Sequence, residues 1–224
     1  MKSCFACTLF FVSLLVVPQK ATGQPSRNPC LYAWLTRESN QALTLDRYRV
    51  LYDFKSKERI ASVGAGGGSK EIVYSMMADS LVFFLQDIDS TCLTASKIGS
   101  TSSQLYRVSD RTCTAEFIGV VGTEEDVKLP GGLDKVIMEN TLHELTYPEK
   151  TIGGIRRSLK PDGFLFIQDF IASKPGQKHR GCKKRLYTED ELISLLNKVG
   201  FDLVESSYVY PSNKEDRLYK FQLR

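Results

Sequence analysis

The sequence predicts an α/β fold that binds a nucleotide-like ligand at one edge of its sheet. A short apolar run, residues 60–63, leads directly into a glycine-rich turn at residues 64–68. A helical pattern of apolar residues follows, and a second apolar run, residues 81–85, ends in acid at Asp87. Glycines let the backbone approach a ligand closely, and a carboxylate after the next strand can accept hydrogen bonds from both ribose hydroxyls. The alternative is a purely structural βαβ unit with a flexible turn.

The chain divides into three parts. Residues 1–23 contain Lys2, an apolar stretch over residues 5–17 and a small-residue ending at Gly23, which is the layout of a secretory signal peptide. Cleavage is expected before Gln24, and the apolar stretch is too short to span a bilayer comfortably. We therefore expect an exported protein, periplasmic or secreted, with no membrane span after cleavage; an uncleaved anchor is the alternative. Residues 24–44 are predicted to be a linker and helical cover, and residues 45–224 one domain.

The charge of the chain argues against nucleic-acid binding. Removing residues 1–23 takes away Lys2 and Lys20 and no acid, so the formal charge falls from +4 to +2. No general basic character is left to attract a polyanion. The sequence gives no indication of the oligomeric state.

Four cysteines remain in the mature chain, at positions 30, 92, 113 and 182. They form no CxxC or histidine-paired metal spacing, and His179 with Cys182 supplies too few ligands, so no metal site is predicted. Cys92 and Cys113 bracket one poorly structured segment and are the first predicted disulfide pair. Free buried thiols are equally compatible with the sequence.

Other elements follow in order along the chain. Apolar spacing predicts two short helices between residues 30 and 54, lying over the sheet. Residues 90–114 are rich in serine and threonine, with poor helix propensity and no clear boundaries. Further strands are expected at residues 115–121, 135–138 and 164–167, with a helix starting at Pro148. The best specified helix has Thr188 as N-cap, Glu191 as capping-box partner and Gly200 as its stop. Two final strands, residues 203–210 and 218–223, suit an antiparallel hairpin.

Polar side chains follow three of these strands, at Asp87, at residues 124–126 and at Asn140. Open α/β sheets bind ligands outside the carboxyl ends of their strands. The three groups are therefore predicted to meet at one edge of the sheet.

The order of these motifs resembles the class I S-adenosylmethionine-dependent methyltransferases, over roughly residues 45–224. The matching segments are VGAGGG at 63–68, QDID at 86–89, LP at 129–130 before LDKVIMENTLHEL, LKPDGFLFI at 159–167 and YTEDELISLLNKVGF at 187–201. Each segment is common, but five in this order before a hairpin are fairly specific. The resemblance implies a Rossmann-like seven-stranded mixed sheet with helices on both faces and a C-terminal antiparallel hairpin. It also implies methyl transfer from S-adenosylmethionine to a small acceptor, with residues 45–224 as the methyltransferase-like domain.

The resemblance further implies the residues of the cofactor site. The glycine turn would approach the methionine part and the ribose of the cofactor through Gly64, Ala65, Gly66 and Gly68. Asp87 would accept hydrogen bonds from the ribose hydroxyls, and Ile88 would pack on the adenine face. Thr123 and Glu124 would lie by the adenine amino group, and Glu139 and Asn140 would face the methionine end and the substrate entrance.

Two positions depart from the pattern of that family. An acid is usual two residues before the first glycine, and here that position is Ser62. An aspartate often follows the glycine after the third strand, and here Thr123 stands there, with Glu124 one place later. Both departures bear on how tightly the chain would bind the cofactor.

His143 is the one plausible general base by position, and its neutral form would suit that task at pH 7. A histidine that caps or packs a helix is the alternative. The basic loop of residues 174–185 follows the fifth strand and could recognise an anionic acceptor, although such a charge run is usually a solvated loop.

Two other functions compete with methyl transfer. A catalytically inactive binding protein with the same fold is favoured by Ser62 and by export, because the supply of cofactor outside the cytoplasm is not assured. A dinucleotide-dependent oxidoreductase would also use glycines and an acid, but its fingerprint asks for a third glycine where this chain has Ser69.

Overall fold

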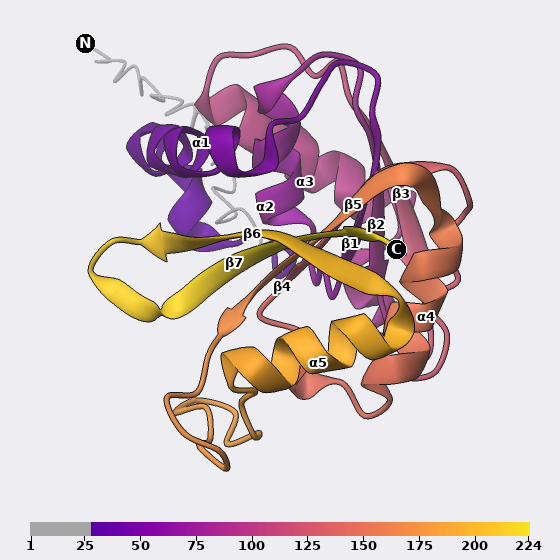
Figure 1. Cartoon of the computed structure of the whole chain (residues 1–224). Coiled ribbons are helices and arrows are strands. Elements are labelled where there is room, and N and C mark those ends of the chain that lie inside the picture. Colours follow the sequence, from indigo (N-terminus) through magenta and orange to yellow (C-terminus); the bar gives the residue numbers. More distant parts are fainter. Residues whose placement is uncertain (1–27) are drawn as a thin grey trace, which may run out of the picture.

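The computed structural model describes residues 28–224 (Figure 1). The predicted signal peptide, residues 1–23, lies outside the described residues. No helix within residues 28–224 has the length and apolar character needed to cross a bilayer.

One seven-stranded sheet organises the structure, with the strand order β3-β2-β1-β4-β5-β7-β6. The strands are β1 (Arg59–Val63), β2 (Val82–Asp87), β3 (Glu116–Val121), β4 (Leu133–Glu139), β5 (Leu159–Phe170), β6 (Phe201–Tyr210) and β7 (Asn213–Leu223). Strands β1 to β5 pair in parallel, and β7 pairs antiparallel with both β5 and β6. The predicted seven-stranded mixed sheet and its C-terminal hairpin are confirmed. The hairpin turn is shorter than expected, because β7 begins at Asn213.

Helices cover both faces of this sheet (Figure 1). On one face lie α1 (Glu38–Tyr52), α2 (Ser69–Tyr74) and α3 (Ala95–Val108), and on the other lie α4 (Pro148–Ser158) and α5 (Glu189–Val199). Short 3-10 turns occur at η1 (Ala33–Thr36), η2 (Ser75–Met77), η3 (Ser90–Cys92) and η4 (Leu142–Glu144). Side chains alternate along the central strands, so Val136 and Met138 pack with α4 and α5 while Ile137 packs with the aromatic side chains of α1.

Helix α3 corrects the expectation that residues 90–114 are poorly structured. Thr94 caps the helix by accepting a hydrogen bond from the backbone N–H of Lys97 at 3.4 Å. The buried side chains recur at helical spacing, and they are Ile98, Thr101, Ser102, Leu105 and Tyr106. Burial of this stripe against α2 and η1 outweighs the weak intrinsic propensity of serine and threonine.

The helix predicted near the C-terminal end of the domain is confirmed, whereas the helices predicted near its N-terminal end are corrected. Two short helices were expected between residues 30 and 54, but the structure has one 3-10 turn and one helix of 15 residues, α1. The capping box at α5 is confirmed, with Thr188 and Glu191 bonded reciprocally and Gly200 in the left-handed conformation at the C-terminal end. A cap is a local signal, whereas the long α1 depends on burial of Tyr48 and Tyr52 beneath it.

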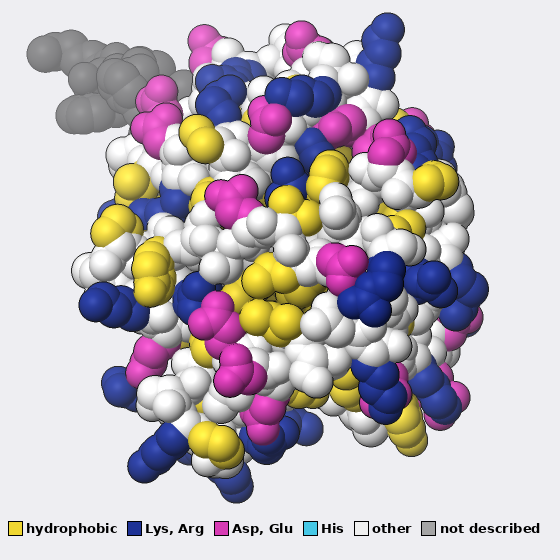
Figure 2. All heavy atoms as spheres, in the orientation of Figure 1, with side chains coloured by type: hydrophobic (Ala, Val, Ile, Leu, Met, Phe, Trp, Pro, Cys, Tyr) yellow, Lys and Arg dark blue, Asp and Glu magenta, His cyan; other side chains and the backbone are white. Residues whose placement is uncertain are grey.

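On the face shown in Figure 2, acidic and basic side chains are interspersed around a hollowed apolar area near the centre of the view. Among the described residues visible there, no broad area carries a single sign of charge.

The predicted disulfide between Cys92 and Cys113 is wrong, because Cys92 is bonded to Cys30, with their Cα atoms 5.5 Å apart. Cys113 and Cys182 are free and exposed. Cys113 lies beside the middle of α3, where the Ser102 hydroxyl donates to its sulfur at 3.8 Å. The segment between positions 92 and 113 was expected to be poorly structured but contains α3, so closeness in the sequence did not predict the pair.

Removing the disulfide should destabilise the fold. The bond closes a loop with a sequence separation of 62, and loops of this size contribute about 2–4 kcal/mol to the free energy of unfolding. A Cys30→Ser, Cys92→Ser double variant should lose that amount in urea unfolding followed by circular dichroism. Cys113→Ser is the matched control and should unfold like the parent chain; a double variant as stable as the parent would contradict the assignment.

Candidate functional site

The glycine turn lies at the point where the strand order reverses, between β1 and β4. The backbone N–H groups of Gly64 and Ala65 both donate to the carbonyl of Gln86 at 2.9 Å. Gly64 has a φ of +75°, and a Cβ there would lie 2.2 Å from Oγ1 of Thr141, so only glycine fits against the end of β4. Gly66 has a φ of +54° and open space where its Cβ would point. In open α/β sheets this reversal point is where ligands bind.

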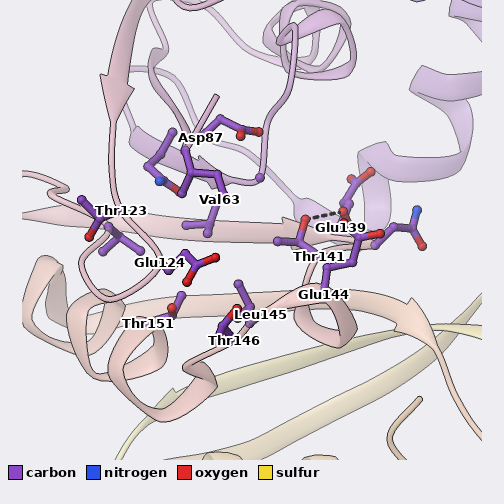
Figure 3. A pocket seen from close by; sticks show the side chains of 15 residues that line it. Val63, Asp87, Thr123, Glu124, Glu139, Thr141, Glu144, Leu145, Thr146 and Thr151 are labelled. Atoms are coloured by element: carbon purple, nitrogen blue, oxygen red, sulfur yellow. Dashed lines mark hydrogen bonds between the residues drawn. The ribbon is translucent and has the colours of Figure 1, made fainter. Parts of the chain in front are cut away.

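A hollow of about 280 Å³ lies outside the carboxyl ends of β1, β2 and β4. We call it the first hollow. In Figure 3, Asp87 lies on one side of it, Thr123 and Glu124 lie toward one end, and Glu139, Thr141 and Glu144 lie toward the other. The sequence-predicted residues that line it are Gly64, Asp87, Ile88, Thr123, Glu124, Glu139 and Asn140. The structure therefore brings together most of the residues that the sequence analysis selected.

A second hollow, of about 420 Å³, adjoins the first, because Gly64 and Glu139 line both. Ala65 also lines it, and its outer wall is the N-terminal segment from Pro29 to Tyr32 together with Cys92. The wall is fixed by the Cys30–Cys92 disulfide and by the Ser69 hydroxyl, which donates to the carbonyl of Cys30 at 3.1 Å. Of the predicted site residues, Gly66, Gly68 and His143 line neither hollow.

Asp87 is held in place by the glycine turn and by its own loop. Its Oδ2 accepts a hydrogen bond from the backbone N–H of Gly66 at 2.8 Å, and its Oδ1 accepts one from the backbone N–H of Asp89 at 3.0 Å. Carboxylate oxygens have further lone pairs, so both can still accept from a ligand. The next side chain, Ile88, is 58% exposed at the edge of the first hollow, although it is apolar. A fixed acceptor beside an exposed apolar side chain suits a sugar joined to a flat ring.

Asn140 offers an acceptor without a partner. Its backbone has a φ of 51°, in the left-handed region, and its N–H donates to the carbonyl of Gln168 at 2.8 Å. Its side-chain Oδ1 is buried and has no hydrogen-bond partner within the described chain. Buried polar atoms are nearly always paired, so an unpaired one lining a hollow indicates a ligand group or water at that position.

Glu139 is the centre of a buried hydrogen-bond network that sequence analysis did not find. Its Oε1 accepts from the hydroxyl groups of Tyr52 and Tyr74, at 2.5 and 2.8 Å, and its Oε2 accepts from Lys70 at 2.6 Å. Burial, and then the charge of Glu139, raises the pKa of both tyrosines well above the usual value, so they remain donors. No local pattern marks these partners, because they come from α1 and α2.

An acid of α2 lies beside position 62, where the expected acid is missing. The Ser62 hydroxyl donates to Oε1 of Glu71 at 2.7 Å, and both residues line the second hollow. Glu71 is only 4% exposed, and burial followed by the nearby charge of Glu139 raises its pKa to about 7. Sequence reasoning missed Glu71, because its role depends on a contact with Ser62 on the neighbouring strand β1.

The sequence analysis expected the His143 ring to be neutral at pH 7, and the structure indicates a protonated ring. Burial lowers the pKa of His143, but the hydrogen bond and charge of Asp169, with a further contribution from Cys182, outweigh burial and raise it to about 9. Its Nδ1 lies 2.6 Å from Oδ1 of Asp169, and its backbone N–H donates to Oδ2 of the same carboxylate at 3.0 Å. At pH 7 the ring is therefore protonated rather than neutral, and a protonated ring cannot act as a general base.

The basic loop, residues 174–185, folds as a compact turn below β5 (Figure 1). Lys178 forms an isolated β-bridge with Arg185, and the N–H of His179 donates to the carbonyl of Lys184 at 2.8 Å. The lysine and arginine side chains of the basic loop are exposed, and none of them lines either hollow. Their arrangement is that of a solvated loop.

Comparison with known proteins identifies the fold. No protein-family profile matches the chain. A SAM-dependent methyltransferase from Aquifex aeolicus is similar in structure, with a TM-score of 0.61 and 21% identity over 82% of this chain and 93% of that one. A 1,6-didemethyltoxoflavin-N1-methyltransferase from Burkholderia thailandensis, solved with S-adenosylhomocysteine, has a TM-score of 0.59 and 17% identity over 84% of this chain and 80% of that one. The chain thus has the fold of the class I S-adenosylmethionine-dependent methyltransferases.

The same fold also occurs in the [4+2]-cyclase SpnF, with a TM-score of 0.56 and 17% identity over 77% of this chain. The match covers 59% of the cyclase chain. Likeness of this degree establishes the fold and leaves the reaction to be argued from the site.

The raised pKa of Glu71 predicts a pH-dependent stability. Because the pKa of about 7 in the folded state lies above the usual value of 4.5 for a glutamate, the folded state holds the proton more tightly than the unfolded state. This stabilisation is present below about pH 4.5 and is lost as the pH rises through 7. Glu71→Gln removes the effect, so its unfolding free energy relative to the parent should increase by up to about 3 kcal/mol between those pH values.

The measurement is chemical unfolding of both proteins across this pH range. Ser62→Ala is the control, because it keeps the carboxyl group and removes a hydrogen bond that lowers the pKa of Glu71. The pH slope should persist in that variant. A difference between Glu71→Gln and the parent that does not change with pH would contradict the assignment.

Proposed function

We propose that this chain binds S-adenosylmethionine and transfers its methyl group to a small acceptor. The observation that carries the proposal is the carboxylate of Asp87, bonded to the N–H of Gly66 at the edge of two joined hollows. The fold of the chain and the methyltransferases that share it add support. Acceptance of a ribose diol by an acid at the end of the second strand is the chemistry that this geometry offers.

The residues around the hollows fit the parts of such a cofactor. Asp87 would accept from the ribose hydroxyls, and Ile88 would cover one face of the adenine, with Thr123 and Glu124 at its edge. Gly64 and Ala65 would lie beside the methionine part, which extends toward the second hollow. There the carboxyl group of Glu71, bonded to Ser62, would face the cofactor's ammonium group and take over the role of the missing acid. The positive charge of that ammonium group would lower the pKa of Glu71 and so favour its ionised form.

The bound cofactor would supply an activated methyl group, and the protein would position the reactants. Asn140, Thr141 and Glu144 line the end of the first hollow away from Thr123, so they would contact the acceptor. The unpaired Oδ1 of Asn140 would accept a hydrogen bond there. Alignment of the acceptor with the methyl group, together with exclusion of water, would account for most of the rate enhancement. His143 would support this end of the site through Asp169 rather than remove a proton.

We further propose that the chain is exported and that the acceptor need not be anionic. The Cys30–Cys92 disulfide supports export, since such bonds persist in oxidising compartments. The exposed position of the basic loop, away from both hollows, gives it no direct contact with an acceptor there. Export also favours the second candidate function, a binding protein that retains the site and performs no methyl transfer, because cofactor supply outside the cytoplasm is uncertain.

One prediction of the proposed function concerns Asp87. Asp87→Ala should weaken binding of S-adenosylmethionine and S-adenosylhomocysteine by about tenfold to a hundredfold, because charge-assisted hydrogen bonds to ribose are lost. Isothermal titration calorimetry measures this, with NAD as the ligand control and Asp89→Ala as the matched variant, since Asp89 lines neither hollow. Equal affinity of the Asp87 variant and the parent would exclude this placement of the cofactor.

Another prediction of the proposed function concerns cofactor binding by Glu71. At pH 8 its carboxylate should attract the cofactor's ammonium group, so Glu71→Gln should weaken binding by about tenfold or more. Adenosine has no ammonium group and is the control ligand, because its affinity should not change in this variant. If Glu71→Gln binds S-adenosylmethionine as the parent does, the methionine part lies elsewhere.

A further inference from the structure

Two histidines and a cysteine converge beside β5, outside both hollows. One ring nitrogen of His143, one of His179 and the sulfur of Cys182 all lie within 4.8 Å of one another. Histidine, cysteine, aspartate and glutamate side chains can bind metal ions. Among those of residues 28–224, these three are grouped closely enough to hold one. Sequence reasoning found His179 and Cys182 too few for a site, because the third side chain comes from η4, far away in the chain.

His143 is oriented as a metal-bound histidine would be. Its Nδ1 lies 2.6 Å from Oδ1 of Asp169, and this carboxylate is itself fixed by the backbone N–H groups of His143 and Phe170. The other ring nitrogen, Nε2, is buried and has no hydrogen-bond partner within the described chain. The side chains of His143 and Asp169 are each only 2% exposed. A carboxylate behind one ring nitrogen, with no protein partner on the other nitrogen, is the arrangement that orients histidines toward zinc.

The basic loop presents the other two ligands from a preformed turn. Nδ1 of His179 lies 3.2 Å from the sulfur of Cys182, and the N–H of Lys183 donates to the carbonyl of His179 at 3.1 Å. The ring of His179 packs against those of His143 and Phe170, with both centroid distances 5.0 Å. The loop therefore already holds its ligands next to His143.

We propose that His143, His179 and Cys182 form a binding site for a thiophilic divalent transition metal, with zinc as the expected ion. Two imidazole nitrogens and one thiolate suit zinc, whereas magnesium and calcium prefer oxygen ligands. The ion binds Nε2 of His143, one nitrogen of His179 and the Cys182 thiolate. It displaces the Nε2 proton of the protonated His143 ring and the thiol proton of Cys182, and both protons are released to solvent. Asp169 is a positioning residue, because it acts on the metal through His143.

Three protein ligands leave one position of a tetrahedral ion for another molecule. Glu144 lies close to these ligands, since its Oε1 is 3.7 Å from Nε2 of His143, and it also lines the first hollow. The metal site therefore lies next to the end of the first hollow opposite Thr123 and Glu124. Metal binding itself does not depend on the proposed methyl transfer.

The test uses the purified chain and cobalt(II), which takes the place of zinc and reports on its ligands by absorption. Under anaerobic, non-reducing conditions, which keep the Cys30–Cys92 disulfide intact, one equivalent should produce a thiolate-to-cobalt charge-transfer band and strong visible absorption. Zinc should remove both by displacing cobalt. Cys182→Ser should abolish the charge-transfer band, and Cys113→Ser, which changes the other free exposed cysteine, should leave it unchanged.

Further variants separate ligation from folding. His179→Ala lies on the exposed loop and should lose tight binding without a change in circular dichroism. Asp169→Asn should weaken metal affinity by about tenfold to a hundredfold, as loss of a carboxylate behind a ligand does. The proposal is overturned if folded protein gives no cobalt spectrum, if the charge-transfer band persists in Cys182→Ser, or if it disappears in Cys113→Ser.

Discussion

The carboxylate of Glu139 is the interaction on which the site depends most. It lies at the end of β4, where it accepts hydrogen bonds from Tyr52 of α1 and from Tyr74 and Lys70 of α2. A buried carboxylate without such partners would be strongly unfavourable, and Lys70 supplies the opposite charge. Because Glu139 lines both hollows, the same contacts that join the helices to the sheet also set the shape of the crevice. Burial raises the pKa of Glu71, and the charge of Glu139 raises that pKa further.

Local signals predicted much of the fold. The glycine turn, the acid after β2, the proline at the start of α4 and the capping box of α5 each depend on a few neighbouring residues, and the structure has all of them. Helix α3 could not be predicted in this way, because serine and threonine are poor helix formers and its stability comes from burial against α2 and η1. The disulfide partner of Cys92 was missed for a related reason, since α3 was not predicted and the partner, Cys30, has a sequence separation of 62 from Cys92.

The residues of the candidate site likewise fall into those that the sequence predicts and those that it does not. The residues that follow strands, such as Asp87 and Asn140, could be selected from sequence because parallel strands deliver their carboxyl ends to one edge. Glu71, Lys70 and Tyr52 could not, since each acts through a contact between elements. The hydrogen bond between Ser62 and Glu71 places an acid of α2 beside the position where the sequence pattern lacks one.

The disulfide also divides the crevice into two parts with different freedom to open. The covalent loop between Cys30 and Cys92 encloses α1, β1, the glycine turn, α2 and β2, which together carry one wall of both hollows. Partial unfolding of any of these elements must occur within a closed ring, which restricts how far the chain can separate. The opposite wall, formed by residues that follow β3, by the end of β4 and by residues after it, lies outside that ring. Slow amide hydrogen exchange would then be concentrated in the elements inside the ring, while the wall outside it keeps more freedom to change its shape.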